Sequence, residues 1–331
     1  MSPRLKQILK YLFFLGLGAF FLYLAFRKTD FQKILADFRQ ADYQYVIISM
    51  LMGYAAFVSR GLRWNLLLDP LGKKARPWNA IHAISIGYFT NAAVPRAGEV
   101  ARCTALKTTD DIPVNRLFGT VVLERAIDGI MLLSLILLTI ILELPKLLNF
   151  FDSAFEGQEG GGNSWIWKAA IAVVLVAGVL VLYLIRERFQ AHPAYQKVRQ
   201  FWNGFKEGFR SFGKIQNKFA FFAHTIFIWA MYYLMIYVVV FALPATAGID
   251  PSSGLFLMVV GGFGMIVPSP GGIGSYHYLV MLGMTVLGVS RTDGLSFATL
   301  VHGGQFIMTI VAGLIALLAV YRQRRIQKLA A

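Results

Sequence analysis

The chain has 331 residues, of which 57% are hydrophobic and only 15% are charged. A soluble domain of this length carries more charge and lacks the long apolar runs found here. The single cysteine, Cys103, excludes an internal disulfide bond. The formal net charge of +15 does not indicate a nucleic-acid partner, because membrane topology explains most of it.

Six apolar segments are long enough to cross a bilayer, whose hydrocarbon core requires about 20 residues of helix. The first follows a basic N-terminus and has no small-residue cleavage site, so we interpret it as a retained anchor and not as a signal peptide. The sequence therefore predicts an all-α polytopic membrane protein. The predicted full spans are residues 8–26, 43–62, 117–142, 165–185, 219–243 and 294–320.

Two further apolar segments are interrupted by proline and glycine. Residues 78–94 run into VPRAGEVARC, which is too polar to continue through lipid, and VPSPGGIG separates residues 252–267 from 275–289. Irregular backbone is tolerated at membrane depth only where protein or a watery cavity satisfies its N–H and C=O groups. We therefore predict two broken re-entrant hairpins, although each segment also fits two short spans joined by a turn. The predicted structural breaks are Pro95, Gly98, Pro268 and Pro270.

The two broken segments mark an internal repeat. Each follows two spans and precedes one long span, so each unit crosses the membrane three times and the second unit is inverted relative to the first. Many transporters have this plan, with the binding site near the midplane where broken helices meet. We predict eight membrane segments in a single domain, residues 1–331. Repeat one covers about 1–142, repeat two about 165–320, and a short basic tail residues 321–331.

The loop charges predict the orientation of the chain. Lys and Arg residues are retained on the cytoplasmic side of a membrane. If the N-terminus is inside, the inner segments hold most of the Lys and Arg residues. We therefore expect both termini to be cytoplasmic and the protein to lie in the cytoplasmic (inner) membrane.

The span at residues 117–142 contains Glu124, Arg125 and Asp128. Each charge inside a span costs about 2.5 to 3.5 kcal/mol, so such residues usually have a partner or a role. Their spacing of three and four residues allows all of them to share one side of a helix. One interpretation is a self-neutralising structural cluster. In the other, Arg125 binds an anionic headgroup while the two carboxylates set the charge balance or take up protons.

Four other arginines are candidates for further positive charge. Arg60 and Arg63 lie at the inner end of the second span, where they also fit residues that snorkel to the interface. Arg96 lies inside the first break, so its guanidinium is placed to bind a phosphate beside the N–H groups of the next half-helix. Arg102 follows in that half-helix, and Glu99 in its first turn either balances charge or caps the helix.

The second break is rich in glycine. Gly271, Gly272 and Gly274 allow the backbone to approach a ligand closely, and Ser275 either binds it or caps a helix. His277 is either a proton-linked switch or a satisfied buried histidine, and the same two readings apply to His302. At the first break, the Asn91 side chain is expected to form hydrogen bonds with backbone groups that lose their helical partners.

No motif indicates a cofactor, a metal or an ATPase. The sequence has no GxxxxGK[ST] phosphate-binding loop, so we expect passive or ion-coupled movement of a substrate. An enzyme requires a nucleophile or metal site with a poised base. Cys103, Ser275 and His277 show no such spacing, so we expect a protein that is not an enzyme.

Three motifs in this order resemble the lysylphosphatidylglycerol synthase transmembrane-region family of flippase-like membrane proteins: NAAVPRAGEVAR, LERAIDG and PSPGGIGSYH. The resemblance covers nearly the whole chain and implies a membrane domain that moves lipids or lipid-linked headgroups between leaflets. Relatives of the multiprotein resistance factor type also carry an aminoacyltransferase domain, which we do not expect here because the chain stops just beyond Tyr321. His277 stands where the family usually has a Glu.

The leading hypothesis from the sequence is therefore a lipid flippase or transporter. Its expected partners are anionic lipids or lipid-linked intermediates, and a separate lipid-synthesising enzyme. Three alternatives remain: a small-solute or ion transporter on the same scaffold, an enzyme that modifies lipid headgroups, and an adaptor for such an enzyme.

Overall fold

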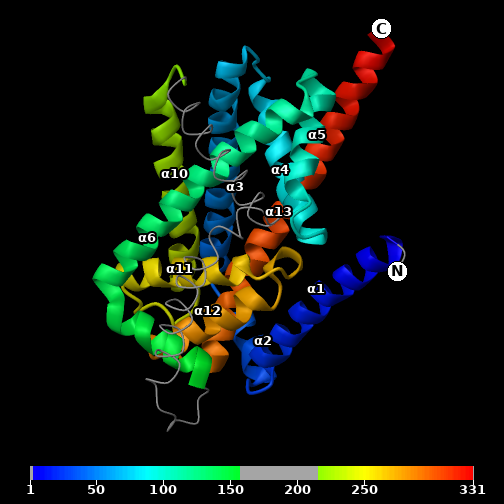
Figure 1. Ribbon diagram of the computed structural model, residues 1–331. Helices are drawn as coiled ribbons and strands as arrows, with labels where there is room; N and C mark the ends of the chain where they lie inside the picture. The colour runs from blue at the N-terminus through cyan, green and yellow to red at the C-terminus, as the bar shows by residue number, and fades with distance from the viewer. Residues whose placement is uncertain (1–2, 157–214, 331) are drawn as a thin grey trace, which may run out of the picture.

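The computed structural model describes residues 3–156 and 215–330, and every regular element within these ranges is helical. Figure 1 shows long helices crossing the molecule with shorter helices between them. The helices are α1 (Pro3–Phe26), α2 (Phe31–Gln40), α3 (Tyr43–Leu68), α4 (Pro77–Ala93), α5 (Gly98–Asp110), α6 (Val114–Glu156), α10 (Lys218–Tyr237), α11 (Pro251–Ile266), α12 (Ser275–Val286) and α13 (Arg291–Ala330). Short 3₁₀ turns are η1 (Asp69–Leu71), η2 (Val238–Ala242) and η3 (Pro270–Gly272).

Four helices in the described part of the chain are long and apolar enough to cross a membrane. They are α3, α6, α10 with η2, and α13, and they correspond to the predicted spans 43–62, 117–142, 219–243 and 294–320. A fifth candidate is α1 together with α2, which are bent by 88°. The bend lies in the break between the two helices, and Asp30 at the end of this break caps α2 by accepting from the N–H groups of Gln32 and Lys33. The predicted span 8–26 thus lies in α1, whereas 165–185 lies outside the described residues.

The first broken hairpin consists of α4 and α5. They contain 17 and 13 residues, which at about 1.5 Å per residue makes each shorter than the roughly 30 Å hydrocarbon core. Pro95 follows the end of α4, where a helix cannot continue without losing a hydrogen bond. The N–H of Gly98, the first residue of α5, donates to the Asn91 side chain at 2.7 Å. Asn91 therefore satisfies broken backbone, as the sequence predicts.

The second broken hairpin consists of α11 and α12, with η3 between them. The two helices contain 16 and 12 residues, so they are also shorter than the hydrocarbon core. Gly271, Gly272 and Gly274 all have positive φ angles, which glycine adopts without steric cost. Pro268 and Pro270 lie in the same break. The helix ends lie within three residues of the predicted segments 252–267 and 275–289.

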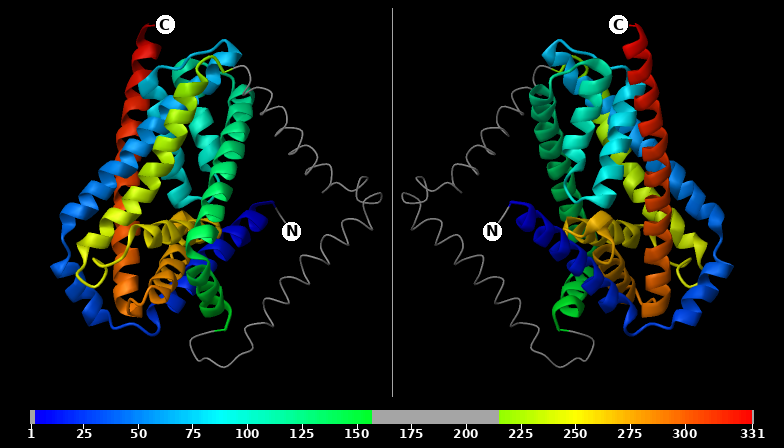
Figure 2. Two further views of the ribbon diagram at one scale, coloured as in Figure 1. Left: turned by 90° about the vertical axis from the view of Figure 1, so that its left-hand side faces the viewer. Right: turned by 90° about the vertical axis from the view of Figure 1, so that its right-hand side faces the viewer.

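The two breaks meet inside the molecule. Figure 1 shows the joined ends of α4 and α5 directed towards the loop between α11 and α12, and Figure 2 shows the same approach from two other sides. A Cβ atom built on Gly271 would lie 3.4 Å from the Cα atom of Ala92, near the end of α4. Helix α1 lies against the second break, because a Cβ on Gly18 would lie 3.2 Å from the Ile273 carbonyl oxygen.

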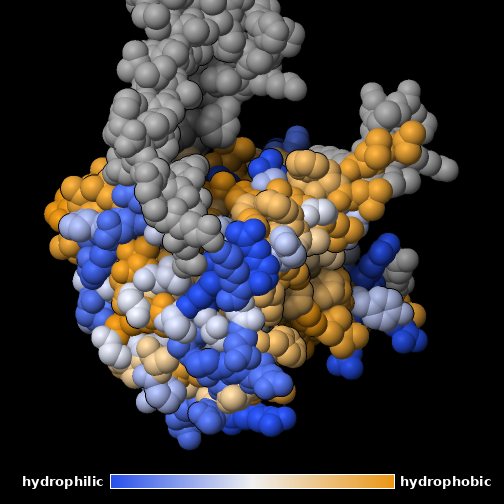
Figure 3. All heavy atoms as spheres, turned by 90° about the horizontal axis from the view of Figure 1, so that it is seen from below, coloured by the Kyte–Doolittle hydropathy of each residue, from blue (hydrophilic) through white to orange (hydrophobic). Residues whose placement is uncertain are grey.

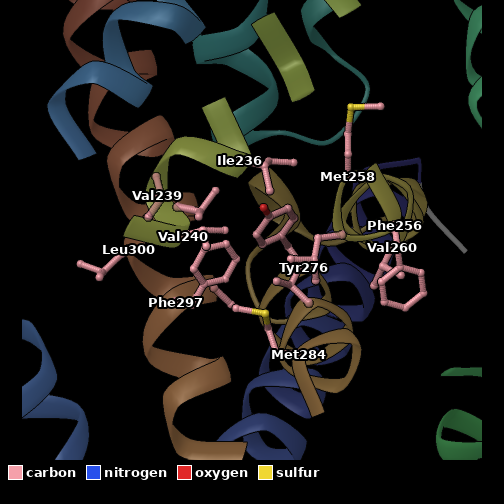
Figure 4. Close-up of a cluster of buried hydrophobic side chains, with 14 of the residues drawn as sticks. Ile236, Val239, Val240, Phe256, Met258, Val260, Tyr276, Met284, Phe297 and Leu300 are labelled. Atoms are coloured by element: carbon pink, nitrogen blue, oxygen red, sulfur yellow. The ribbon is translucent and has the colours of Figure 1, made fainter. Parts of the chain in front are cut away.

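Buried apolar side chains hold both hairpins to the long helices. Figure 4 shows the cluster around the second hairpin, in which Ile236 of α10, Tyr276 of α12 and Phe297 of α13 pack together. Large hydrophobic side chains are instead exposed on the outside of the bundle, such as Ile141, which is 78% exposed. In Figure 3, which views the end of the molecule near α2, hydrophilic residues occupy the central and lower part of the face and hydrophobic residues its sides. This distribution is typical of a protein surrounded by lipid.

Candidate functional site

A buried carboxylate on α6 forms the centre of the site. The Glu124 side chain is fully buried and contacts three guanidinium groups. Its Oε1 atom lies 2.6 Å from Nε of Arg60 and 3.4 Å from Nη2 of Arg63, and its Oε2 atom lies 2.8 Å from Nη1 of Arg102. These contacts join α6 to α3 and α5, and they neutralise a charge that would be costly to bury alone.

The two arginines of α3 are paired inside the protein and do not snorkel to the interface. Their side chains are at most 3% exposed. Both reach Asp128, one turn after Glu124: Arg63 Nη2 lies 2.8 Å from Oδ1, and Arg60 Nη2 contacts Oδ2. Arg63 also donates to the Thr225 hydroxyl of α10 at 3.1 Å. Snorkelling is excluded because the carboxylates that bind these guanidinium groups lie within the bundle.

Two tyrosines complete the environment of Arg60. Its Nη1 atom donates to the hydroxyl groups of Tyr88 on α4 and Tyr232 on α10, at 2.6 and 2.9 Å, and these hydroxyls lie 3.0 Å apart. Neither tyrosine is among the site residues predicted from the sequence. The available signal was the spacing of Tyr88 and Asn91, which lie three residues apart and therefore on one face of a helix.

Helix α5 adds one arginine and one carboxylate. Arg102 Nε lies 2.6 Å from Oε2 of Glu99, and the guanidinium carbon lies 4.7 Å from the centre of the Trp64 ring. The Nη2 atom of Arg102 is buried without a hydrogen-bond partner among the described residues. A buried N–H donor without a partner costs about 1 to 3 kcal/mol, so this atom indicates an unfilled position for an acceptor.

Arg125 is the exposed member of the cluster. Its side chain is 47% exposed, its Nη2 atom lies 2.6 Å from Oε1 of Glu99, and its Nη1 atom lies 3.9 Å from Oδ2 of Asp128. Arg125 and Arg102 line one pocket between α4, α5 and α6, together with Ile84, Gly87, Tyr88, Asn91, Gly98 and Glu99. The connected side chains comprise four guanidinium groups and three carboxylates, which leaves an excess of one positive charge.

Arg96 lies apart from this pocket. It has a positive φ of 65° in the first break, its side chain is exposed, and it forms no hydrogen bond or ion pair with a described residue. Arg125 lines the pocket and Arg96 does not, and phosphate binding by each of them stays a prediction.

The candidate residues of the second break are also separate from the arginine cluster. Ser275 is fully buried, donates to the Gly264 carbonyl oxygen at 2.7 Å and lies 2.8 Å from the Ser269 hydroxyl, so it satisfies broken backbone. Gly274 lies against the backbone of Gly18 on α1. His277 lines a second cleft, which α13 shares.

The fold and the ion cluster together define a multi-pass helical membrane protein with two broken hairpins and a charged site at the first of them. The chain belongs to the family described as the lysylphosphatidylglycerol synthase TM region, whose model matches residues 7–313. It is also 23% identical to the UPF0104 membrane protein MJ1595 of Methanocaldococcus jannaschii, over 96% of this chain and 94% of that protein. No solved structure matches the chain.

Proposed function

We propose that this protein moves an anionic phospholipid or a lipid-linked headgroup between the leaflets of the cytoplasmic membrane. The observation that carries the proposal is the pair of arginines in the first pocket. Arg125 is half-exposed, and Arg102 has a buried N–H donor that finds no partner in the described part of the chain. A phosphate bound there accepts hydrogen bonds from both guanidinium groups. The excess positive charge of the cluster is compensated when an anion enters.

The pocket in the observed conformation is too small for a headgroup. Its volume is about 20 Å³, which is room for about one water molecule. A headgroup therefore enters only when α5 moves relative to α6. The ion pair between Glu99 and Arg125 connects these two helices. A phosphate that binds Arg125 in place of Glu99 breaks this connection.

We further propose that the two broken hairpins are re-entrant parts of inverted repeats, with both termini cytoplasmic. Support comes from the short helices of both hairpins and from the contact between Gly271 and Ala92. In such transporters the two repeats rock against each other around the bound substrate. A lipid-synthesising enzyme that supplies the headgroup is the proposed protein partner.

The proposal is tested with purified protein in liposomes that contain a fluorescent phosphatidylglycerol. Replacement Arg125→Gln removes the charge but keeps an amide donor, and we expect lipid movement to fall about ten-fold or more, because a hydrogen bond to a charged group contributes about 1.5 to 3 kcal/mol. The matched control is Arg116→Gln, an exposed arginine on the same helix that lies outside the pocket. Equal rates for the wild type and Arg125→Gln, with both proteins folded, would refute the proposal.

The small volume of the pocket supports one second candidate, a transporter of a small anion. The same liposomes discriminate between the two functions when they are loaded with inorganic phosphate. Phosphate efflux that depends on Arg125, without movement of the fluorescent lipid, would favour the small-solute transporter.

A further inference from the structure

A second cleft lies beside the second break, between α1, α12 and α13. Its volume is about 250 Å³, far more than the space that one water molecule requires. The arginine cluster does not reach it. The cleft is lined by Leu22, Phe26, Ile273, His277, Thr299, His302, Gly303 and Phe306.

One of its two imidazoles, that of His302, has a tautomer set by the backbone. The Nε2 atom of His302 lies 2.8 Å from the carbonyl oxygen of Gly271. A carbonyl oxygen only accepts hydrogen bonds, so Nε2 carries the hydrogen atom. In a neutral imidazole the other nitrogen is then an acceptor. The Nδ1 atom of His302 is therefore an acceptor, and it has no hydrogen-bond partner among the described residues.

Within the part of the chain that the structure describes, the imidazole of His277 presents a free donor, whereas that of His302 presents a free acceptor. The N–H of Gly274 donates to Nδ1 of His277 at 3.4 Å, so the hydrogen atom of this ring is on Nε2. That donor also lacks a partner within residues 3–156 and 215–330. The residues His277 and His302 are only 7% and 8% exposed, and their ring centres lie 4.8 Å apart. As far as the described residues go, the apolar cleft thus contains one unpaired donor beside one unpaired acceptor.

We propose that this cleft binds a lipid whose polar end is a free hydroxyl group. A hydroxyl is both a donor and an acceptor, so one such group accepts from Nε2 of His277 and donates to Nδ1 of His302. The hydrocarbon chains lie against Leu22, Phe26 and Phe306 and extend into the surrounding bilayer. Ester and phosphodiester oxygens only accept, so they leave the His302 acceptor unpaired. The site goes beyond the proposed transport function, because neither Arg102 nor Arg125 takes part in it.

The test compares two probes that differ by one hydrogen-bond donor: dioleoylglycerol and its O-methyl ether. Purified protein is incubated with each probe in detergent, and the bound fraction is measured by native mass spectrometry. We expect the wild type to retain the alcohol at least about five-fold more than the ether, because an unpaired buried group costs about 1 to 3 kcal/mol. Equal retention of both probes, or binding of detergent only, would overturn the proposal.

Variants locate the binding within the cleft. We expect His277→Phe and His302→Phe to reduce retention of the alcohol to the level of the ether. His302→Gln restores a donor for the Gly271 carbonyl and an acceptor for the hydroxyl, so it should recover much of the preference and controls for misfolding. His82→Phe, on α4 and outside the cleft, should behave as the wild type. Arg125→Gln should also keep the preference, so failure of the transport proposal and failure of this one are distinguishable.

Discussion

Arg60 on α3 and Glu124 on α6 form a buried ion pair, with 2.6 Å between Nε and Oε1 and no more than 3% of either side chain exposed. They are 64 positions apart in the sequence. Arg63 and Arg102 bind the same carboxylate, so Glu124 is shared by three guanidinium groups from two helices. These ion pairs connect α3, α5 and α6 around the first pocket.

The first prediction concerns this shared carboxylate. Replacement Glu124→Gln keeps the shape of the side chain but leaves buried guanidinium groups without their counter-charge. Breaking a buried ion pair in this way costs about 3 to 5 kcal/mol of stability. The loss should appear as a much lower unfolding midpoint of the purified protein in detergent.

The matched control for Glu124→Gln is an ion pair on the surface. Lys107 and Asp111 form such a pair at the end of α5, and both side chains are exposed. Surface pairs are screened by solvent, so Lys107→Met should leave the unfolding midpoint nearly unchanged. If Glu124→Gln and Lys107→Met lower the unfolding midpoint equally, the buried ion pairs of Glu124 stabilise the fold no more than a surface pair does.

The second prediction concerns a glycine at the first break. A Cβ atom on Gly98 would overlap the carbonyl oxygen of Gly87 and lie 2.6 Å from Cγ of Asn91. We expect Gly98→Ala to destabilise the protein by about 1 to 3 kcal/mol, because α4 and α5 must move apart. On α6, Gly119 has no atom near such a Cβ, so Gly119→Ala should stabilise that helix by up to about 1 kcal/mol. Thermal unfolding of both variants tests the predicted opposite signs.

The third prediction concerns the cap of α11. The side-chain hydroxyls of Ser252 and Ser253 donate to Asp250, and together with the Ser253 N–H they hold the pKa of this carboxyl well below its ordinary value. A carboxyl whose folded-state pKa is lowered contributes stability above its unfolded pKa of about 3.9, and this contribution is lost as the pH falls through the folded-state pKa. Asp250→Asn should therefore be less stable than the wild type near about pH 6.

Unfolding midpoints measured over a range of pH check the sign of this effect. The gap between the wild type and Asp250→Asn should narrow as the pH falls below about 4, where the carboxyl becomes protonated in the unfolded chain. A gap that stays constant with pH would show that the amide fails to replace the carboxylate for a reason other than charge.

Local chemistry explains which parts of the fold the sequence predicts. Pro95 and Gly98 lie at the first break, and Pro268 and Pro270 lie at the second. Proline and glycine change the backbone conformation at their own positions, so their effect can be predicted without knowing the neighbouring helices. The four long spans follow from apolar composition in the same way. These features require no knowledge of which helices become neighbours.

Tertiary pairing explains what the sequence leaves open. Arg60 and Arg63 fit snorkelling residues equally well until α6 places Glu124 and Asp128 beside them. Arg96 has the right residue type in the right break, but the structure leaves its side chain outside the pocket. The hydroxyls of Tyr88 and Tyr232 meet at Arg60 from separate helices, so no local pattern indicates that these two side chains come together.

The last prediction links the contact between the two breaks to transport. A Cβ atom on Gly271 would lie 3.4 Å from Cα of Ala92, which is close enough for a disulfide bond between cysteines at the two positions. In a Cys103→Ser background, the double variant Ala92→Cys/Gly271→Cys should move fluorescent lipid only after reduction, because the oxidised bond prevents the two breaks from separating as the proposed transport mechanism requires. Each single-cysteine variant controls for the effect of its own substitution and should be insensitive to reductant. Full transport by the oxidised, cross-linked protein would show that the two breaks stay together during the transport cycle.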